Sequence, residues 1–298
     1  MKLSKKKIFF SILGMSLLMF LAYKVYDAIT QNIEEKKHQE YVSTLEPTKS
    51  KNVHILSDAI AIDYLNEKRT LAVYLPQGYN ADSTDYSVIY FLDGQSLFDQ
   101  KIQGGMEWEL DEVLDSLGNI GAQQSIVVGI YNSDRRMKEY KPFGSDRWYS
   151  DWTVSGDKHA DWIVSKLKPW IDSKYRTRKE AAKTYIGGAS LGGLMSYYML
   201  MEYPDTFGGA FVFSPSFWVN EKVYTLHKDN NKLQNQKIYF DAGELETPTV
   251  TSVKKMEKVL LDAGMPRENI KVDIEKGLGH WHMTWKNGFR KAYPWIVQ

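Results

Sequence analysis

Short hydrophobic segments alternate with helical patterns along most of the chain. Apolar or alternating segments of strand length occupy residues 69–75, 87–92, 125–130, 183–186, 209–213, 237–242 and 270–274. The 3.6-residue period of a helix appears in residues 107–117, 158–175, 194–203, 251–263 and 285–295. Strands that alternate with helices predict an α/β fold, with a mostly parallel central sheet and helices on both faces.

The first residues of the chain follow a different pattern. Lysines within residues 2–7 precede a continuous apolar segment, residues 8–23, in the arrangement of an export signal. Because no small-residue cleavage site follows, we expect an uncleaved single-pass anchor in the cell membrane, with the folded domain outside the cytoplasm. Secretion after cleavage of this signal is the alternative.

The next segment, residues 30–52, is polar and carries mixed charges, which is typical of a tether. The total length of 298 residues suits one large domain with such an appendage. We therefore expect an N-terminal membrane anchor or signal sequence (1–29), a polar tether (30–52) and one α/β domain (53–298).

Composition excludes several classes of function. The net charge of +1 offers no basic surplus for nucleic acid, and the 43% hydrophobic content is enough for a sizeable core. The chain has no cysteine, which excludes disulfides, thiolate metal sites and a cysteine nucleophile. No spacing typical of a metal site, such as H-E-x-x-H, occurs, so we infer no metal. We also infer no cofactor and no obligate protein partner.

The segment GGASLGG (187–193) lies between a predicted strand and a predicted helix. Gly188, Ser190 and Gly192 form the G-x-S-x-G pattern of a nucleophile elbow, whose context is a strand, a sharp turn and a helix. The glycines leave room for the strained turn, and the start of the helix directs N–H groups at the reacting oxygen. The pattern therefore indicates a nucleophilic serine at position 190.

A serine becomes a nucleophile when a base takes its proton and a carboxylate orients that base. In a sheet of this kind the expected chain order is serine, acid and histidine, with each group near the carboxyl end of a strand. Acidic residues follow the strand at 237–242, and two histidines follow the strand at 270–274. The residues alone leave the acid open between Asp241, Glu244 and Glu246, and the base open between His280 and His282.

Several stretches carry a resemblance to a known family. They are FLDGQSLFD (91–99), WELDEVLD (108–115), IVVGI (126–130), LKPWIDSKYRT (167–177), GGASLGGLMSYYMLMEYPDTFGGAFVFSPSFW (187–218), YFDAGELE (239–246) and GHWHMTW (279–285). Together they resemble an esterase family of α/β-hydrolases. That family includes esterase D and enterochelin esterase-like enzymes, feruloyl and acetyl-xylan esterases and the antigen 85 acyltransferases.

The resemblance implies roles for single residues. The acid of the family stands three positions after the glycine of a D-x-G-x-x-E/D motif, which selects Glu246. Its histidine follows a glycine and precedes a tryptophan by five positions, which selects His280, although Trp281 stands where the family commonly has asparagine or aspartate. The backbone N–H groups of Leu191 and of Gln95, in the DGQ turn, are the expected oxyanion hole.

The resemblance therefore implies a serine carboxylic-ester hydrolase that works through an acyl-enzyme outside the cytoplasm. Siderophore, carbohydrate-linked and small acyl esters are the candidate substrates. Substrate contacts are expected from Trp148, Trp152, Trp218, Trp281 and Arg135, three of them in a long loop at 131–157. The alternatives are an acyltransferase that uses the same acyl-enzyme and a non-catalytic surface protein that binds a ligand on this fold.

Overall fold

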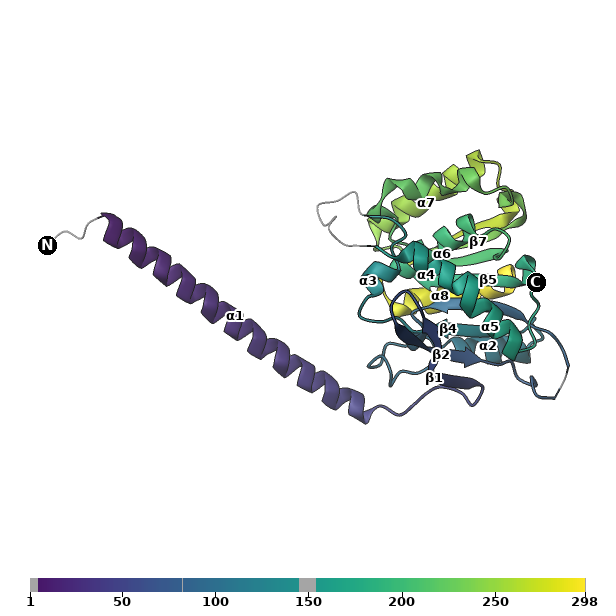
Figure 1. Cartoon of the computed structure of the whole chain (residues 1–298), viewed down its shortest axis with the longest axis horizontal. Helices are drawn as coiled ribbons and strands as arrows, with labels where there is room; N and C mark the ends of the chain where they lie inside the picture. Colours follow the sequence, from purple (N-terminus) through teal and green to yellow (C-terminus); the bar gives the residue numbers. More distant parts are fainter. Residues whose placement is uncertain (1–4, 82, 145–153, 298) are drawn as a thin grey trace. The chain divides into compact units, whose positions relative to one another are not determined.

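The computed structural model describes residues 5–81, 83–144 and 154–297 (Figure 1). The chain divides into two compact units, Met1–Pro47 and Thr48–Gln298. In the first unit a single helix, α1 (Lys5–Thr44), continues through much of the segment for which we predicted a polar tether. Within the described residues no helix has both the length and the apolar composition of a membrane span, so the anchor predicted through residues 8–23 gains no support.

The second unit is built on a sheet of eight strands in the order β1-β2-β4-β3-β5-β6-β7-β8. Their bounds are β1 (Val53–Ile62), β2 (Glu67–Tyr74), β3 (Ser87–Leu92), β4 (Ser125–Ile130), β5 (Thr184–Ala189), β6 (Gly209–Phe213), β7 (Lys237–Gly243) and β8 (Ile270–Glu275). The pairs β1–β2 and β2–β4 are antiparallel, and every other pair is parallel. This confirms the prediction of a mostly parallel sheet.

Strand β1 was not among the strands predicted from the sequence. Its pairing with β2 shifts register between Leu56 and Ile60, and Asp58 adopts a positive φ of 47° within it. Such a bulge breaks the strict alternation of side chains on which a sequence-based assignment depends.

Helices cover both faces of the sheet (Figure 1). The α-helices are α2 (Leu110–Asn119), α3 (Arg136–Glu139), α4 (Gly156–Trp162), α5 (Lys168–Lys174), α6 (Leu191–Glu202), α7 (Thr247–Asp262) and α8 (His282–Ile296). A π-helical turn, η2 (Ile163–Leu167), joins α4 to α5 where we predicted one continuous helix. Short 3-10 helices are η1 (Gly94–Ser96), η3 (Ala181–Lys183), η4 (Phe217–Val219), η5 (Glu221–Asp229), η6 (Leu233–Asn235) and η7 (Arg267–Asn269).

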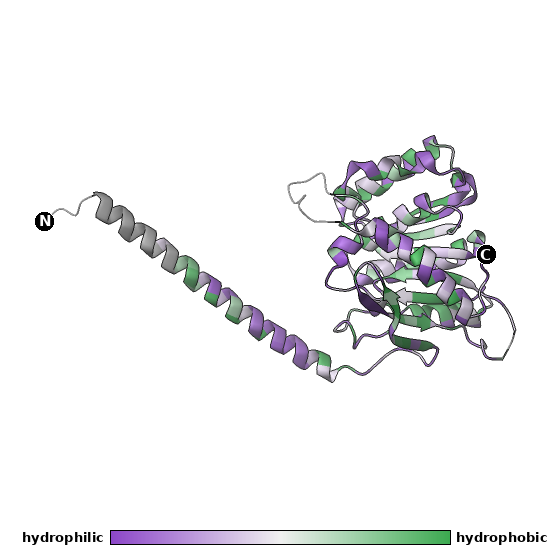
Figure 2. Ribbon diagram, in the orientation of Figure 1, coloured by the Kyte–Doolittle hydropathy of each residue, from purple (hydrophilic) through white to green (hydrophobic). Residues whose placement is uncertain are grey.

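The core has two layers, one on each side of the sheet. In β3 the side chains of Val88, Tyr90 and Leu92 belong to one layer, with α4 to α7, whereas Ile89 and Phe91 belong to the other, with α2 and α8. Alternate burial on two faces explains why the central strands read as continuous apolar segments. In Figure 2 hydrophilic residues recur along the covering helices α5 and α7.

Because the strands β3 and β5 to β8 are parallel, the chain leaves them at the same edge of the sheet. The residues that follow these ends, directly or after a short turn, are Asp93, Ser190, Ser214, Glu246 and His280. The topology therefore gathers groups far apart in the sequence at one edge, where ligands bind in open α/β sheets.

Candidate active site

Ser190 occupies a strained turn between β5 and α6, with φ 59° and ψ −120°. A Cβ at Gly188 would lie 2.7 Å from the backbone of Gly192, and a Cβ at Gly193 would lie 2.7 Å from the carbonyl oxygen of Phe213. Backbone atoms cannot yield to such a contact, so glycine is required at both positions. Gly193, outside the G-x-S-x-G pattern, is thus as necessary to the turn as Gly188.

The hydroxyl of Ser190 lies next to a second serine hydroxyl, that of Ser216. Its Oγ lies 3.3 Å from Oγ of Ser216, and the backbone N–H of Ser216 donates to the carbonyl oxygen of Ser190 at 3.0 Å. The N–H of Ser190 in turn donates to Phe213 at 3.0 Å, which ties the turn to the end of β6. Ser216 is therefore the hydrogen-bond partner of the Ser190 hydroxyl in this structure.

His280 and Glu246 form a short hydrogen bond, with Nδ1 of the imidazole 2.6 Å from Oε2 of the carboxylate. The other oxygen of Glu246 accepts from Oγ of Ser214 at 2.7 Å and from the N–H of Gly243 at 2.9 Å. Burial raises the pKa of Glu246, but the hydrogen bonds from His280, Ser214 and Gly243 outweigh it and hold this pKa below its ordinary value. The carboxylate is thus charged and fixed at both oxygens.

The other acids that the sequence left open have different surroundings. Glu244 is exposed, and its Oε2 accepts from the N–H of Gly277 at 2.9 Å, so it braces the turn after β8. Asp241 is fully buried against α8, and neither of its oxygens has a hydrogen-bond partner within the described residues. Burial raises the pKa of Asp241 far above its ordinary value, with further increases from Glu275 and other carboxylates.

His282, the second candidate base, begins α8 and packs against the ring of Trp281 at 4.5 Å between centroids. Burial lowers its pKa, and Nδ1 has no hydrogen-bond partner within the described residues. Among the described residues, His280 and not His282 is paired with a carboxylate.

A cavity of about 210 Å³ opens beside Ser190. Its lining includes Ala189, Trp108, Trp285 and Arg136. The indole of Trp285 packs on Trp108 at 5.1 Å between centroids, and it meets the edge of the His280 ring at 5.2 Å. Trp285 thus contacts His280 and shares the cavity wall with Ser190, although no hydrogen bond joins Ser190 to His280 in the described chain.

The turn after β3 is held by a dense set of hydrogen bonds. Asp93 has a positive φ of 61°, and its carboxylate accepts from Nε and Nη2 of Arg136 at 2.6 and 2.7 Å and from Nδ2 of Asn132 at 2.5 Å. The side chain of Gln95 accepts from the N–H of Asn132 at 3.1 Å. We call Asp93, Asn132 and Arg136 the Asp93 clamp, because they fix the turn that carries Gln95.

The two expected oxyanion donors both lie at helix starts. Leu191 is the first residue of α6, and Gln95 lies in η1, so their N–H groups precede the internal hydrogen bonds of these helices. Gly192 connects the two turns, since a Cβ there would lie 3.3 Å from Oδ2 of Asp93. Both donors therefore sit on turns that pack against one another.

The residues expected to contact substrate are not gathered in one place. Arg135 forms a half-exposed ion pair with Glu67 at 3.3 Å, and its neighbour Arg136 lines the cavity instead. Trp218 and Trp281 are 50% and 51% exposed, close in sequence to Ser216 and His280 respectively. Trp148 and Trp152 lie outside the described residues. The loop predicted at 131–157 contains α3.

Ser214, Ser216, Trp285 and Asn132 were not predicted from the sequence as site residues, and of the two adjacent arginines Arg135 was predicted rather than Arg136. The two serines follow the end of β6 in the same way that Ser190 follows β5, and this position is the one signal that could have identified them. Nothing in the sequence distinguishes Arg136 from Arg135, because a helical turn decides which of them faces Asp93.

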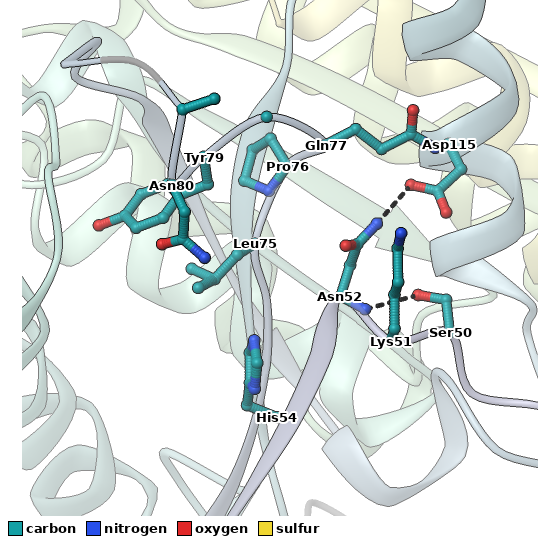
Figure 3. Close-up of a pocket in the computed structure, with 12 residues that line it drawn as sticks. Ser50, Lys51, Asn52, His54, Leu75, Pro76, Gln77, Tyr79, Asn80 and Asp115 are labelled. Atoms are coloured by element: carbon teal, nitrogen blue, oxygen red, sulfur yellow. Dashed lines mark hydrogen bonds between the residues drawn. The ribbon is translucent and has the colours of Figure 1, made fainter.

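A larger cavity, of about 730 Å³, lies elsewhere in the second unit. It is formed around Leu75 to Ala81 at the end of β2 and includes His54 and Asp115, and Figure 3 shows Asn52 directed toward Asp115 within it. Because β2 runs antiparallel to β4, this cavity lies at the amino ends of the parallel strands. It is therefore at the opposite edge of the sheet from Ser190.

Comparison with known proteins extends these observations. Residues 62–296 match the family described as "Putative esterase". The "Uncharacterized protein YbbA" of Bacillus subtilis (strain 168) is 27% identical over 240 residues, in a match that covers 76% of this chain and 92% of that protein. An "Endo-1,4-beta-xylanase/feruloyl esterase" of Xylanibacter ruminicola is 24% identical over 229 residues, which cover 75% of this chain and 28% of that protein.

Among solved structures, the "Siderophore hydrolase EstA" from Aspergillus nidulans superposes with a TM-score of 0.67. The match covers 85% of this chain and 98% of that one, at 15% sequence identity, and it shows a shared fold. The resemblance inferred from the sequence is thereby confirmed. This chain belongs to that esterase family, and it is a carboxylic ester hydrolase with the α/β-hydrolase fold.

Proposed function

We propose that the chain hydrolyses carboxylic esters through an acyl-enzyme, with Ser190 as the nucleophile, His280 as the base and Glu246 as the acid that orients it. The observation that carries the proposal is the 2.6 Å hydrogen bond between His280 and Glu246, at the sheet edge where Ser190 occupies its strained turn. An orienting carboxylate on Nδ1 leaves Nε2 to accept a proton from the serine.

In the first step the hydroxyl of Ser190 turns from Ser216 toward Nε2 of His280. The imidazole takes its proton while Oγ attacks the ester carbonyl carbon, and the carbonyl oxygen becomes an oxyanion. Glu246 stays ionised, because its pKa is lowered, and stabilises the imidazolium. Catalytic hydrogen bonds are often long in a free enzyme and tighten with substrate, so the Ser190–Ser216 contact is a resting arrangement.

The oxyanion accepts hydrogen bonds from the N–H groups of Leu191 and Gln95. Loss of one donor of this kind typically raises the barrier by about 2.7–4 kcal/mol. The ester oxygen then takes the proton from His280 and leaves as an alcohol. Water, deprotonated by the same imidazole, attacks the acyl-Ser190 carbonyl, and the carboxylic acid is released as Oγ regains its proton.

For the substrate we propose an ester whose acyl group fits the cavity lined by Trp108 and Trp285. Trp108 and Trp285 contact each other and both line the cavity, and this aromatic lining with a volume of about 210 Å³ suits a compact or aromatic acyl group. The names of the feruloyl esterase and siderophore hydrolase relatives support carbohydrate-linked and siderophore esters as the classes to test first.

For location we propose action outside the cytoplasm, after export directed by the N-terminal signal. The lysines within residues 2–7 and the apolar residues 8–23 support export. Immunodetection of a shortened chain in culture medium would support this location, and recovery of the intact chain from the cytoplasmic fraction alone would contradict it.

The test of the reaction uses the purified full chain with a p-nitrophenyl ester of a short acyl group. Ser190→Ala should lower kcat by about 10⁶-fold, as loss of a triad serine does elsewhere. Ser216→Ala, which removes only the resting partner, should stay within about tenfold of the wild type. Equal rates for Ser190→Ala and the wild type would refute the proposal. The same assay with an added alcohol distinguishes a hydrolase from an acyltransferase, since a transferase would form a new ester.

A further inference from the structure

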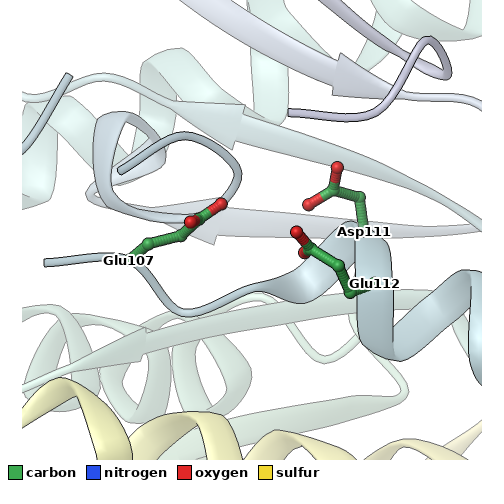
Figure 4. Close-up of side chains that lie close together, drawn as sticks. All are labelled: Glu107, Asp111 and Glu112. Atoms are coloured by element: carbon green, nitrogen blue, oxygen red, sulfur yellow. The ribbon is translucent and has the colours of Figure 1, made fainter. Parts of the chain in front are cut away.

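Three carboxylates converge where the chain enters α2. One oxygen each from Glu107, Asp111 and Glu112 lies within 4.8 Å of the others, and Figure 4 shows their carboxyl groups turned toward one another. Glu107 is 6% exposed and Asp111 is completely buried, whereas Glu112 reaches the surface. The cluster thus has a buried end and an end that is open to solvent.

Two of these buried oxygens have no partner. Oε1 of Glu107 and Oδ1 of Asp111 are inaccessible to solvent and accept no hydrogen bond within the described residues. The second oxygen of each carboxylate accepts a hydrogen bond. Oγ1 of Thr48 donates to Oε2 of Glu107 at 2.7 Å, and the N–H of Ser50 donates to Oδ2 of Asp111 at 2.6 Å. Since buried carboxylate oxygens are nearly always satisfied, each of these two oxygens requires a ligand or a proton.

No cationic side chain of the described residues balances this charge. Within the described residues, no lysine, arginine or histidine forms an ion pair with any of the three carboxylates. Two of the three carboxylates are buried, so the cluster needs either bound protons or a bound cation.

We propose that Glu107, Asp111 and Glu112 bind a divalent cation that prefers oxygen ligands, Ca²⁺ or Mg²⁺. The geometry supports this class, because ligands on opposite sides of a Ca²⁺ ion with bonds of about 2.3–2.6 Å lie about 5 Å apart. No nitrogen or sulfur ligand belongs to the cluster, which disfavours zinc and copper. The exposed Glu112 gives the ion a route from solvent.

The cation would brace two parts of the fold. Thr48 and Ser50 are among the first residues of the second unit, and their bonds to Glu107 and Asp111 attach that segment to α2. The residue after Glu107 is Trp108, which lines the Ser190 cavity. The proposed ion is thus structural, and the inference does not depend on the proposed catalytic mechanism.

The test measures binding without any ester substrate. The full chain is treated with EDTA and dialysed, and calorimetric titration and thermal unfolding are then followed at pH 7.5 with CaCl₂ or with MgCl₂. We expect one ion per chain and, at about a hundredfold excess over Kd, a rise in Tm on the order of 5 °C. Asp111→Asn and Glu112→Gln should each abolish both effects, while Asp262→Asn, a surface carboxylate paired with Lys258, should retain them.

Two results would overturn the proposal. One is an absence of any shift with either salt, together with a Tm that falls as pH rises from about 5 to 8, because protons would then satisfy the cluster and their loss would destabilise the fold. The other is an equal shift in the wild type, Asp111→Asn and Glu112→Gln, which would place the ion elsewhere. Glu112→Gln alters an exposed side chain and keeps the test valid should Asp111→Asn fail to fold.

Discussion

Ser214 donates a 2.7 Å hydrogen bond to Oε1 of Glu246 and accepts one of 2.9 Å from Nε1 of Trp285. Its hydroxyl therefore links the carboxylate of Glu246 to the indole against which the ring of His280 packs. Ser214 is 1% exposed and has a positive φ of 37°, so its backbone is strained as well as buried. The relationship makes Ser214 a positioning residue for the Glu246–His280 pair.

Ser214→Ala should lower kcat about tenfold and leave KM nearly unchanged. The variant removes a hydrogen bond to a charged group, which is typically worth about 1.5–3 kcal/mol, and it leaves the N–H of Trp285 without its acceptor. Steady-state kinetics with a p-nitrophenyl ester measures both parameters. If the variant unfolds in urea as the wild type does and also has the wild-type kcat, Ser214 does not position Glu246.

Glu246→Gln and Glu244→Gln form a matched pair. Glu246→Gln should lower kcat by about 10⁴-fold, because a neutral amide cannot fix the histidine tautomer or stabilise the imidazolium. Glu244→Gln should stay near the wild type, since the side chain of Glu244 accepts its hydrogen bond from the turn at Gly277 and not from His280 among the described residues. Measured kcat values in the reverse order would assign the acid to Glu244.

Arg136→Gln tests the Asp93 clamp. It removes the bidentate pair with Asp93 and should lower kcat by about a hundredfold, because the turn that carries the N–H of Gln95 loses its support and one oxyanion donor shifts. Arg135→Gln is the control, since its exposed pair with Glu67 is worth at most about 1 kcal/mol. Similar kinetics for both variants would show that the clamp does not position the donor.

His159 should make stability depend on pH. It is fully buried beside Tyr64 and Trp162, and burial, with a smaller effect of Arg69, lowers its pKa to about 3. The unfolded chain, with a histidine pKa near 6.5, binds more protons than the folded chain between these values. The stability contributed by neutral His159 is therefore fully present above about pH 6.5 and is lost as pH falls, by at most about 1.4 kcal/mol per pH unit.

His159→Gln should remove that part of the slope. Urea unfolding of wild type and variant at several values between pH 7 and pH 4 gives the two slopes, and only their difference is used, because the substitution also changes packing. Parallel slopes would show that His159 is not the group that titrates.

The sequence by itself determined the strands at the centre of the sheet and the turn at Ser190. Segments such as 87–92 and 209–213 are apolar at every position because both faces of a parallel sheet are covered, and this pattern is local. The G-x-S-x-G pattern is local as well, since the turn must fit between the end of one strand and the first turn of the next helix. A resemblance to relatives then selected Glu246 and His280.

The tertiary structure alone decided which polar groups meet. Asp241, Glu244 and Glu246 lie within six residues, yet only Glu246 reaches His280, because Asp241 points into the core beside α8 and Glu244 bonds to the turn after β8. The contacts of Ser214 with Glu246 and of Arg136 with Asp93 join positions more than thirty residues apart. Hydrophobic periodicity records which face of an element is buried, and it carries no information about which distant side chain lies opposite a polar one.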